Sequence, residues 1–178
     1  MLILQLTGLS GAGKSTLAEA LKKGLEESGF SAEVIDGDRY RNSISKDLGF
    51  SAADRMENIR RLAVVANTFR QQGIIAIIAA INPFEEIRKE VAQTFGAKTI
   101  WLRCDLAILV KRDPKGLYWK ALLPDSDPQK IRNLSGINDP YETPATPDLV
   151  IDTGITDLET SKQALLAFVL TTVKAASG

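Results

Sequence analysis

The sequence contains no histidine, a single cysteine, and no excess of charge of either sign. Without histidine the chain cannot carry a Ser-His-Asp triad, a histidine proton shuttle or a histidine-ligated metal, so proton transfer must depend on carboxylates or water. The 22 basic and 22 acidic side chains cancel, and no overall field attracts nucleic acid or an anionic membrane. Any anion-binding site must therefore be local.

The single thiol and the short apolar runs predict a cytoplasmic protein without a membrane partner. Cys104 cannot form an internal disulfide, which fits a reducing compartment. The opening residues MLILQLTG lack the charged region typical of a signal peptide, and their apolar run is too short to span a bilayer. With 178 residues, 44% of them hydrophobic, residues 1–178 are predicted to form one domain.

Five short β-rich runs alternate with segments of helical period, which is typical of βαβ units. The predicted strands cover residues 2–6, 32–36, 74–81, 99–104 and 148–153, and the predicted helices cover 14–28, 52–72, 85–95 and 157–174. This alternation predicts a three-layer α/β fold with a mostly parallel five-stranded sheet and helices on both faces.

The ends of the helices carry their own signals. Three helical segments are followed by a glycine, where a left-handed residue commonly ends a helix: Gly29, Gly73 and Gly96. Ser51 with Asp54 resembles a capping box, and Thr156 with Glu159 is predicted to open the last helix in the same way.

One region departs from the alternation of strands and helices. Six of the seven prolines fall between residues 114 and 147, and this region lacks sustained periodicity. Long irregular stretches within a domain are usually functional, so we predict a lid over residues 113–147, termed the lid segment.

Residues 8–16 read GLSGAGKST and place the pattern G-x-x-x-x-G-K-S between a predicted strand and a predicted helix. Backbone N–H groups of such a loop bind phosphate, its lysine reaches the β- and γ-phosphates, and its serine ligates Mg²⁺. A nucleoside triphosphate donor is predicted, held by Gly8, Leu9, Ser10, Gly11, Ala12, Gly13, Lys14, Ser15 and Thr16. A glycine-rich turn that binds nothing is the weaker alternative, and the spacing does not fit a Rossmann dinucleotide site.

Two carboxylates follow the second predicted strand, in DGDRYR, where open α/β sheets place their ligands. Of Asp36 and Asp38, one is suited to hold a Mg²⁺-bound water and the other to accept a hydroxyl proton. A solvated turn is the alternative. Arg55 and Asn58 share one face of the next predicted helix, and Arg55 taken alone is interpreted as an ordinary solvated arginine.

Five blocks, taken in order along the chain, resemble the adenylylsulfate kinase family, P-loop kinases that phosphorylate the ribose 3′-hydroxyl of adenosine 5′-phosphosulfate. The blocks are GLSGAGKST at 8–16, DGDRYR at 36–41, LGFSAADRMENIRR at 48–61, RDPKGLY at 112–118 and SGINDPYETP at 135–144. The resemblance implies a P-loop kinase that uses ATP and Mg²⁺ to make 3′-phosphoadenosine 5′-phosphosulfate in sulfate assimilation.

The resemblance also implies roles for individual residues. Asp38 matches the base at the 3′-hydroxyl, Asp36 joins Ser15 at the Mg²⁺ site, and Lys14 and Lys115 are the catalytic cations. Arg112 lies in a nucleotide-binding block. The acceptor-binding positions are Asp38, Arg41, Phe50, Arg55, Asn58, Lys115 and Leu134, with the ring of Phe50 stacking on the adenine.

Three positions depart from the family pattern. Asn82 stands where many members carry a serine proposed to form a phosphoserine, so direct transfer from ATP is expected. Leu134 replaces a typical phenylalanine, which leaves Phe50 as the one aromatic face for the base, and Trp119 replaces a common lysine. A 3′-hydroxyl kinase of another nucleotide conjugate and a catalytically silent nucleotide-binding partner domain stay open as alternatives. So do a homodimer and ATP sulfurylase as a pathway partner.

Overall fold

The centre of the computed structural model, which describes residues 1–175, is a five-stranded parallel sheet. Its strands are β1 (Ile3–Thr7), β2 (Ala32–Asp36), β3 (Ile75–Ala79), β4 (Lys98–Arg103) and β5 (Leu149–Asp152), in the order β2-β3-β1-β4-β5. All four strand pairings are parallel, which confirms the predicted sheet. Every residue of β1 and of β3 is buried, as expected of strands covered on both faces.

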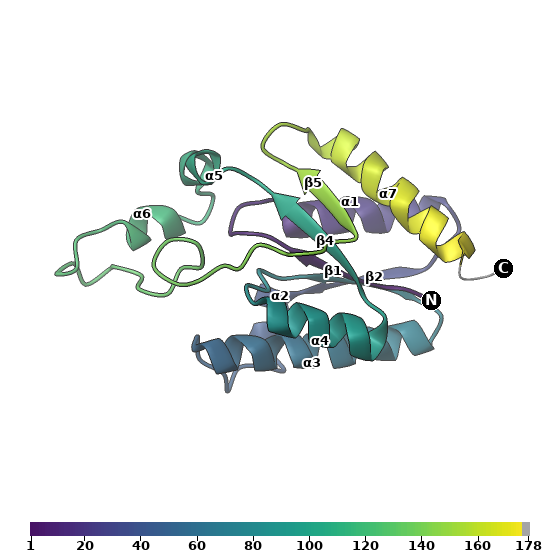
Figure 1. Ribbon diagram of the computed structural model, residues 1–178, viewed down its shortest axis with the longest axis horizontal. Coiled ribbons are helices and arrows are strands. Elements are labelled where there is room, and N and C mark those ends of the chain that lie inside the picture. Colours follow the sequence, from purple (N-terminus) through teal and green to yellow (C-terminus); the bar gives the residue numbers. More distant parts are fainter. Residues whose placement is uncertain (176–178) are drawn as a thin grey trace.

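Helices cover both faces of the sheet, as predicted (Figure 1). The α1 helix (Lys14–Glu27) and α7 (Leu158–Ala175) lie on one face, and α3 (Ala52–Gln71) and α4 (Glu85–Phe95) lie on the other. Side chains of β1 alternate between two cores: Leu4 and Leu6 pack with the cluster that includes α1 and α7, whereas Ile3 packs with the cluster beneath α3 and α4. No helix within residues 1–175 has the length and apolarity needed to cross a membrane.

The predicted boundaries agree with the observed ones to within two residues. The three glycines that follow α1, α3 and α4 have φ values of 84°, 81° and 66°, so each adopts the left-handed conformation. Ser51 Oγ accepts a hydrogen bond from the Asp54 N–H at 3.1 Å, which confirms the cap of α3.

The predicted cap of the last helix is wrong by one residue. The Thr156 hydroxyl donates to the Asp152 carbonyl at 2.7 Å and lies 2.8 Å from the Ser161 hydroxyl of α7, but Thr156 is not at the N-cap position, because α7 begins at Leu158. Asp157 serves instead, because its Oδ1 accepts from the Thr160 N–H at 2.7 Å. Three short helices were not predicted: α2 (Gly37–Arg41), α5 (Leu106–Arg112) and α6 (Leu117–Ala121).

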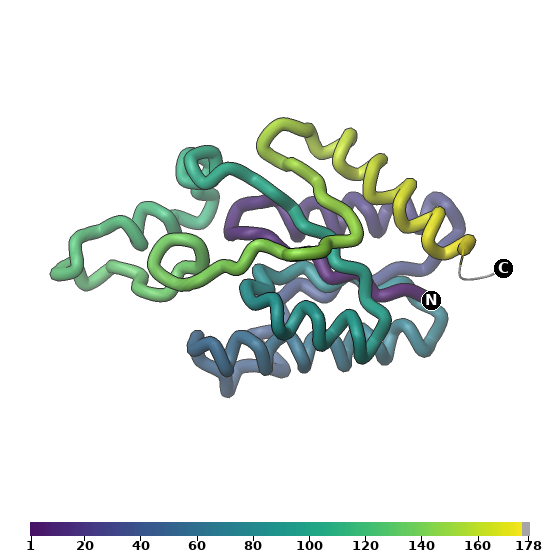
Figure 2. The backbone as a smooth tube through the Cα atoms, in the orientation of Figure 1, coloured from purple at the N-terminus to yellow at the C-terminus, as the bar shows by residue number. Residues whose placement is uncertain are grey.

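The lid segment runs outward from α5 and returns to β5 as an extension of the sheet body (Figure 2). Its regular structure consists of α6 and one isolated bridge between Ser135 and Asp139. The outgoing arm of the lid segment, which contains Lys120, contacts the returning arm, which contains Ile131, because the Ile131 N–H donates to the Lys120 carbonyl at 3.2 Å. At the returning arm, Gly136 has φ 88° and packs so closely on Leu9 that an added Cβ would lie 2.6 Å from Leu9 Cδ2.

Candidate functional site

The phosphate loop joins β1 to α1 at the carboxyl edge of the sheet. Gly8 passes so close to β4 that an added Cβ would lie 2.6 Å from the Leu102 carbonyl oxygen. Gly13, the N-cap of α1, has φ 88°, a conformation that glycine adopts without strain. The loop therefore wraps the start of α1 and lines a cavity with Ser10, Gly11 and Gly13, and the backbone N–H groups of such a loop can bind phosphate.

Lys14 is the cation of this cavity. Its ammonium donates to the carbonyl oxygens of Gly8 and Leu9, each at 2.8 Å. Burial lowers the pKa of the ammonium from 10.5 to about 8, and the nearby Asp38 carboxylate opposes that shift. A phosphate anion placed beside Lys14 would favour its charged form in the same way.

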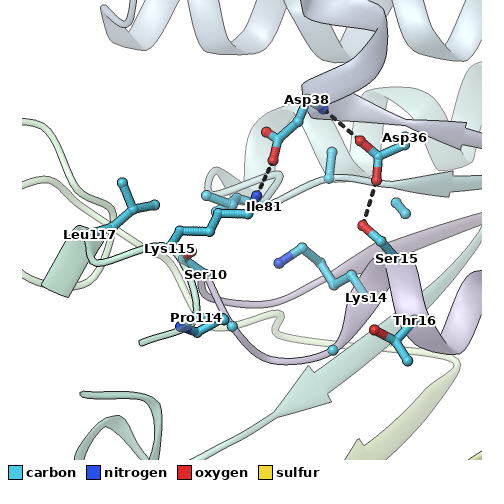
Figure 3. Close-up of a pocket in the computed structure, with 14 residues that line it drawn as sticks. Ser10, Lys14, Ser15, Thr16, Asp36, Asp38, Ile81, Pro114, Lys115 and Leu117 are labelled. Atoms are coloured by element: carbon cyan, nitrogen blue, oxygen red, sulfur yellow. Dashed lines mark hydrogen bonds and ion pairs between the residues drawn. The ribbon is translucent and has the colours of Figure 1, made fainter. Parts of the chain in front are cut away.

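The two aspartates after β2 have different environments (Figure 3). Asp36 Oδ1 caps α2 by accepting from the N–H groups of Asp38 and Arg39, both at 3.0 Å. Asp36 Oδ2 accepts from the Ser15 hydroxyl at 2.5 Å, so the two residues predicted at the Mg²⁺ site are in contact. The side chain of Asp38 is 78% exposed and forms an ion pair with Lys115, which reaches it from the lid segment.

The oxygen atoms of Ser15 and Asp36 fit Mg²⁺. Mg²⁺ prefers oxygen ligands, keeps several waters, and is commonly held by one or two protein groups together with substrate phosphates. Among residues 1–175 no group of three or more histidine, cysteine or acidic side chains is placed to hold a metal alone. Mg²⁺ in this cavity would therefore need the phosphates of the nucleotide as ligands.

A second cavity adjoins the first on the α3 side of the sheet. Five of the predicted acceptor-binding residues line it, and they come from α2, α3 and the loop between them: Asp38, Arg41, Phe50, Arg55 and Asn58. The sixth, Lys115, lines the phosphate-loop cavity, and Asp38, Ala80 and Ile81 line both. Asp38 thus stands where the two cavities meet.

Arg55 is buried, at 9% exposure, so its interpretation as an ordinary solvated arginine is wrong. Its Nε donates to the Phe50 carbonyl at 3.0 Å, and its Nη2 donates to the Asn133 carbonyl at 2.5 Å. Burial lowers the pKa of the guanidinium, and the Asp139 carboxylate, 3.1 Å from Nη2, opposes this. The guanidinium of Arg41 lies over the ring of Phe50, 4.5 Å from its centroid. The cavity therefore presents two cations beside one aromatic face.

Leu134 is buried in the hydrophobic core rather than exposed to the second cavity, which differs from the expectation for this position. Within the described chain it is not among the residues that line the second cavity; it is 5% exposed and belongs to the hydrophobic core. The loop turns it inward because the Asn138 side chain accepts from the Leu134 N–H at 2.8 Å. An apolar side chain at this point gains more by burial in the core than by exposure to the cavity.

A third cavity lies behind the phosphate loop and contains Arg112. Arg112 Nη2 donates to the Thr153 carbonyl at 2.9 Å, and the Thr153 hydroxyl donates to the Ala12 carbonyl at 3.0 Å. Thr153 and Leu158 also line this cavity, although the sequence did not single them out, and so does Thr156, which was considered there only as a helix cap. Their place directly after β5, beside the end of the phosphate loop, was the available signal.

The family model described as adenylylsulphate kinase matches residues 1–152 of the chain. The chain belongs to the adenylylsulphate kinase family. An adenylyl-sulfate kinase of Bacillus pumilus (strain SAFR-032) is 48% identical over 170 residues, covering 94% of this chain and 84% of that protein. A probable bifunctional SAT/APS kinase 2 of Sorangium cellulosum (strain So ce56) is 45% identical, covering 93% of this chain and 28% of that protein.

The solved structure of the Mycobacterium tuberculosis APS kinase CysC in complex with AMPPNP and APS superposes with a TM-score of 0.86. It is 36% identical, and the match covers 94% of this chain and 96% of the other. The structure thus has the fold of a kinase of the adenylylsulphate kinase family.

Proposed function

We propose that the chain transfers the γ-phosphoryl group of ATP to the 3′-hydroxyl of adenosine 5′-phosphosulfate, as an adenylylsulfate kinase. The observation that carries this proposal is the position of Asp38 at the junction of the phosphate-loop cavity and the acceptor cavity. A donor phosphate on one side and a hydroxyl on the other would meet at this carboxylate, as in-line transfer requires. Membership of the family supports the choice of substrate.

The donor would occupy the phosphate loop and the cavity behind it. Loop N–H groups and Lys14 bind the phosphates, and the base and ribose extend toward Arg112 and Thr153. Ser15 and Asp36 would hold Mg²⁺, which neutralises charge on the transferred phosphoryl group when it is bound. The protein thereby supplies positive charge and orientation, which are the main requirements of phosphoryl transfer.

The acceptor would occupy the second cavity. Arg41 and Arg55 offer guanidinium groups to the phosphosulfate, Asn58 contacts the ribose, and the ring of Phe50 stacks on the base. Asp38 accepts the proton of the 3′-hydroxyl. Lys115 forms an ion pair with Asp38 in the structure. During the reaction Lys115 would leave this carboxylate and pair with the phosphates, which would place its ammonium beside the transferred phosphoryl group.

The lid segment, residues 113–147, would close the site against water as part of a single kinase domain. Its outgoing arm is held at the phosphate loop, where the Tyr118 hydroxyl donates to the Ser10 carbonyl at 2.8 Å. Its returning arm is held by Tyr141, whose hydroxyl lies 3.0 Å from the Thr7 hydroxyl. Residues Pro114, Lys115 and Leu117 of the lid segment line the phosphate-loop cavity, so movement of this part of the segment would admit and release nucleotides.

Acceptor identity is tested by measuring ADP release with saturating MgATP and a panel of nucleotides that carry a free 3′-hydroxyl. We expect the highest kcat/KM with adenosine 5′-phosphosulfate and a product phosphorylated at the 3′-position. A higher kcat/KM with another nucleotide conjugate would favour the alternative, a 3′-hydroxyl kinase of that conjugate. This alternative is tested because Phe50 is the one aromatic residue among the described residues that line the acceptor cavity. No ADP release with any acceptor would indicate the silent binding domain.

A cytoplasmic location, a homodimer and ATP sulfurylase as the enzyme that supplies the acceptor belong to the same proposal. The bifunctional relative from Sorangium cellulosum carries a kinase-like region within a longer chain, which supports a functional link with a second enzyme. Sedimentation of the pure chain, alone and with ATP sulfurylase, measures both associations directly.

A further inference from the structure

Tyr118 is a buried side chain of the lid segment that contacts the phosphate loop. It lies on α6, is 0% exposed, and belongs to the core cluster that includes α1 and α7. Its hydroxyl donates to the Ser10 carbonyl at 2.8 Å. Burial raises the pKa of the phenol to about 12, so it keeps its proton at neutral pH and supplies the donor that a carbonyl needs. The contact joins two residues that lie 108 positions apart in the chain.

The position of Tyr118 is fixed by the start of α6. Both carboxylate oxygens of Asp113 accept from this helix: Oδ1 from the Tyr118 N–H at 3.1 Å and Oδ2 from the Trp119 N–H at 2.9 Å. The same end of the lid segment packs on the phosphate loop, because a Cβ added to Gly11 would lie 3.6 Å from Pro114 Cδ. The lid segment and the phosphate loop therefore meet at two consecutive residues of that loop.

The peptide unit between Ser10 and Gly11 links the Tyr118 contact to a backbone donor of the phosphate loop. This peptide is trans, so the Ser10 carbonyl and the Gly11 N–H point in opposite directions. With the carbonyl turned to Tyr118, the N–H is directed away from Tyr118. Ser10 and Gly11 line the phosphate-loop cavity (Figure 3), whereas Tyr118 is not among the described residues that do. Within residues 1–175 the Gly11 N–H has no hydrogen-bond partner, so it is free to bind an anion.

We propose that Tyr118 is a positioning residue for the donor phosphates, because its hydroxyl holds the Ser10–Gly11 peptide with the Gly11 N–H turned to the phosphate. The inference rests on the proposed donor site. Without the hydroxyl this peptide is free to rotate, since Gly11 has φ 76° and glycine tolerates a wide range of backbone angles. A donor that is correctly turned for only part of the time lowers the apparent affinity by that fraction. The seating of α6 therefore contributes to the affinity for the donor.

The test compares the Kd of MgATP, measured by calorimetry, in wild type and Tyr118→Phe, which keeps the ring in the core and removes the hydroxyl. We expect the Kd to rise by roughly 3- to 10-fold, and the KM of the acceptor at saturating MgATP to stay within about twofold. Magnesium tripolyphosphate, which carries the phosphates without the nucleoside, should lose affinity by the same factor. Val91→Ala is the matched control, because Val91 is buried on α4 in the core beneath α3 and α4, and its truncation lowers stability away from the phosphate loop. This control should keep the wild-type Kd.

The outcomes separate the inference from the proposed function. An unchanged Kd of MgATP in Tyr118→Phe would overturn the inference, although wild type still binds MgATP and releases ADP. A weaker MgATP with an unchanged Kd of tripolyphosphate would also overturn it, because the effect would then lie at the nucleoside. An equal rise in Val91→Ala would show that lost stability alone weakens the donor, and the inference would fail. A wild-type protein that binds no MgATP would instead overturn the proposed function. If Tyr118→Phe has a lower melting temperature, its comparison with Val91→Ala decides.

Discussion

Replacement of Lys14 by methionine should separate the effect of this residue on the free energy of unfolding from its effect on turnover. Burial lowers the pKa of the Lys14 ammonium from 10.5 to about 8. Between these two pH values the unfolded chain holds a proton that the folded chain has released. The free energy of unfolding of wild type should therefore rise with pH across this window. Lys14→Met has no titrating group at this position and lacks the rise.

The size of the effect follows from the two pKa values. A pKa that falls from 10.5 to about 8 corresponds to about 3 kcal/mol between the charged and neutral forms. The linkage relation then gives a rise of about 2 kcal/mol between pH 7.5 and 9.5 for wild type relative to Lys14→Met. This figure is an upper limit, because Lys14 is partly exposed and solvent screens its charge.

Urea unfolding of both proteins at pH 7.5, 8.5 and 9.5 measures this difference, and the other titrating groups cancel in it. Turnover of Lys14→Met at pH 7.5 should be lower than wild type by roughly 10³-fold or more, since a cation that stabilises the transition state is lost. A stability difference that is flat or falls with rising pH would show that the ammonium is not desolvated in the folded chain. An unchanged turnover would show that the loop is not the donor site.

Three further substitutions test other parts of the site. Asp38→Asn should leave ATP binding, measured by calorimetry, unchanged and lower kcat by roughly 10²- to 10⁴-fold, because the proton acceptor is removed; near-wild-type turnover would make the carboxylate structural. Leu134→Phe should lower the free energy of unfolding by about 1–3 kcal/mol through overpacking and should leave the affinity for the acceptor unchanged. A higher affinity for the acceptor without a loss of stability would place residue 134 in the acceptor cavity. Gly136→Ala should lower the free energy of unfolding by about 1 kcal/mol or more, because the φ of 88° at Gly136 and its packing on Leu9 disfavour a Cβ. An unchanged melting temperature would show that the loop adapts to the added methyl group.

The fold could be predicted from the sequence because its signals are local. Strands of period two, helices of longer period and the glycines that end them lie within single segments, so their boundaries were found to within two residues. The short helices α2, α5 and α6 were missed because five to seven residues are too few to display a helical period. The cap at Thr156 was misassigned because Asp157, next to it, competes for the same role.

The candidate site could be predicted from the sequence only where its signals are local. The phosphate loop and the aspartates after β2 could be found from spacing, since each follows its own strand. The burial of Arg55 could not, because it depends on Asn133, which lies 78 positions later in the chain. The orientation of Asn82 depends on Gln5, which lies 77 positions earlier. Local sequence therefore indicated which side chains meet, whereas their burial and free hydrogen-bonding atoms required the tertiary structure.

The returning arm of the lid segment connects the two halves of the site. At Gly136 it packs on Leu9 of the phosphate loop, and at Asn133 and Asp139 it contacts the guanidinium of Arg55. A shift of Leu9 on donor binding would change its packing against the backbone of Gly136. The same short loop would then move the partners of Arg55. Donor and acceptor sites are thus linked through the Leu9 side chain, the returning arm and the guanidinium of Arg55, and we expect occupation of one to alter the affinity of the other.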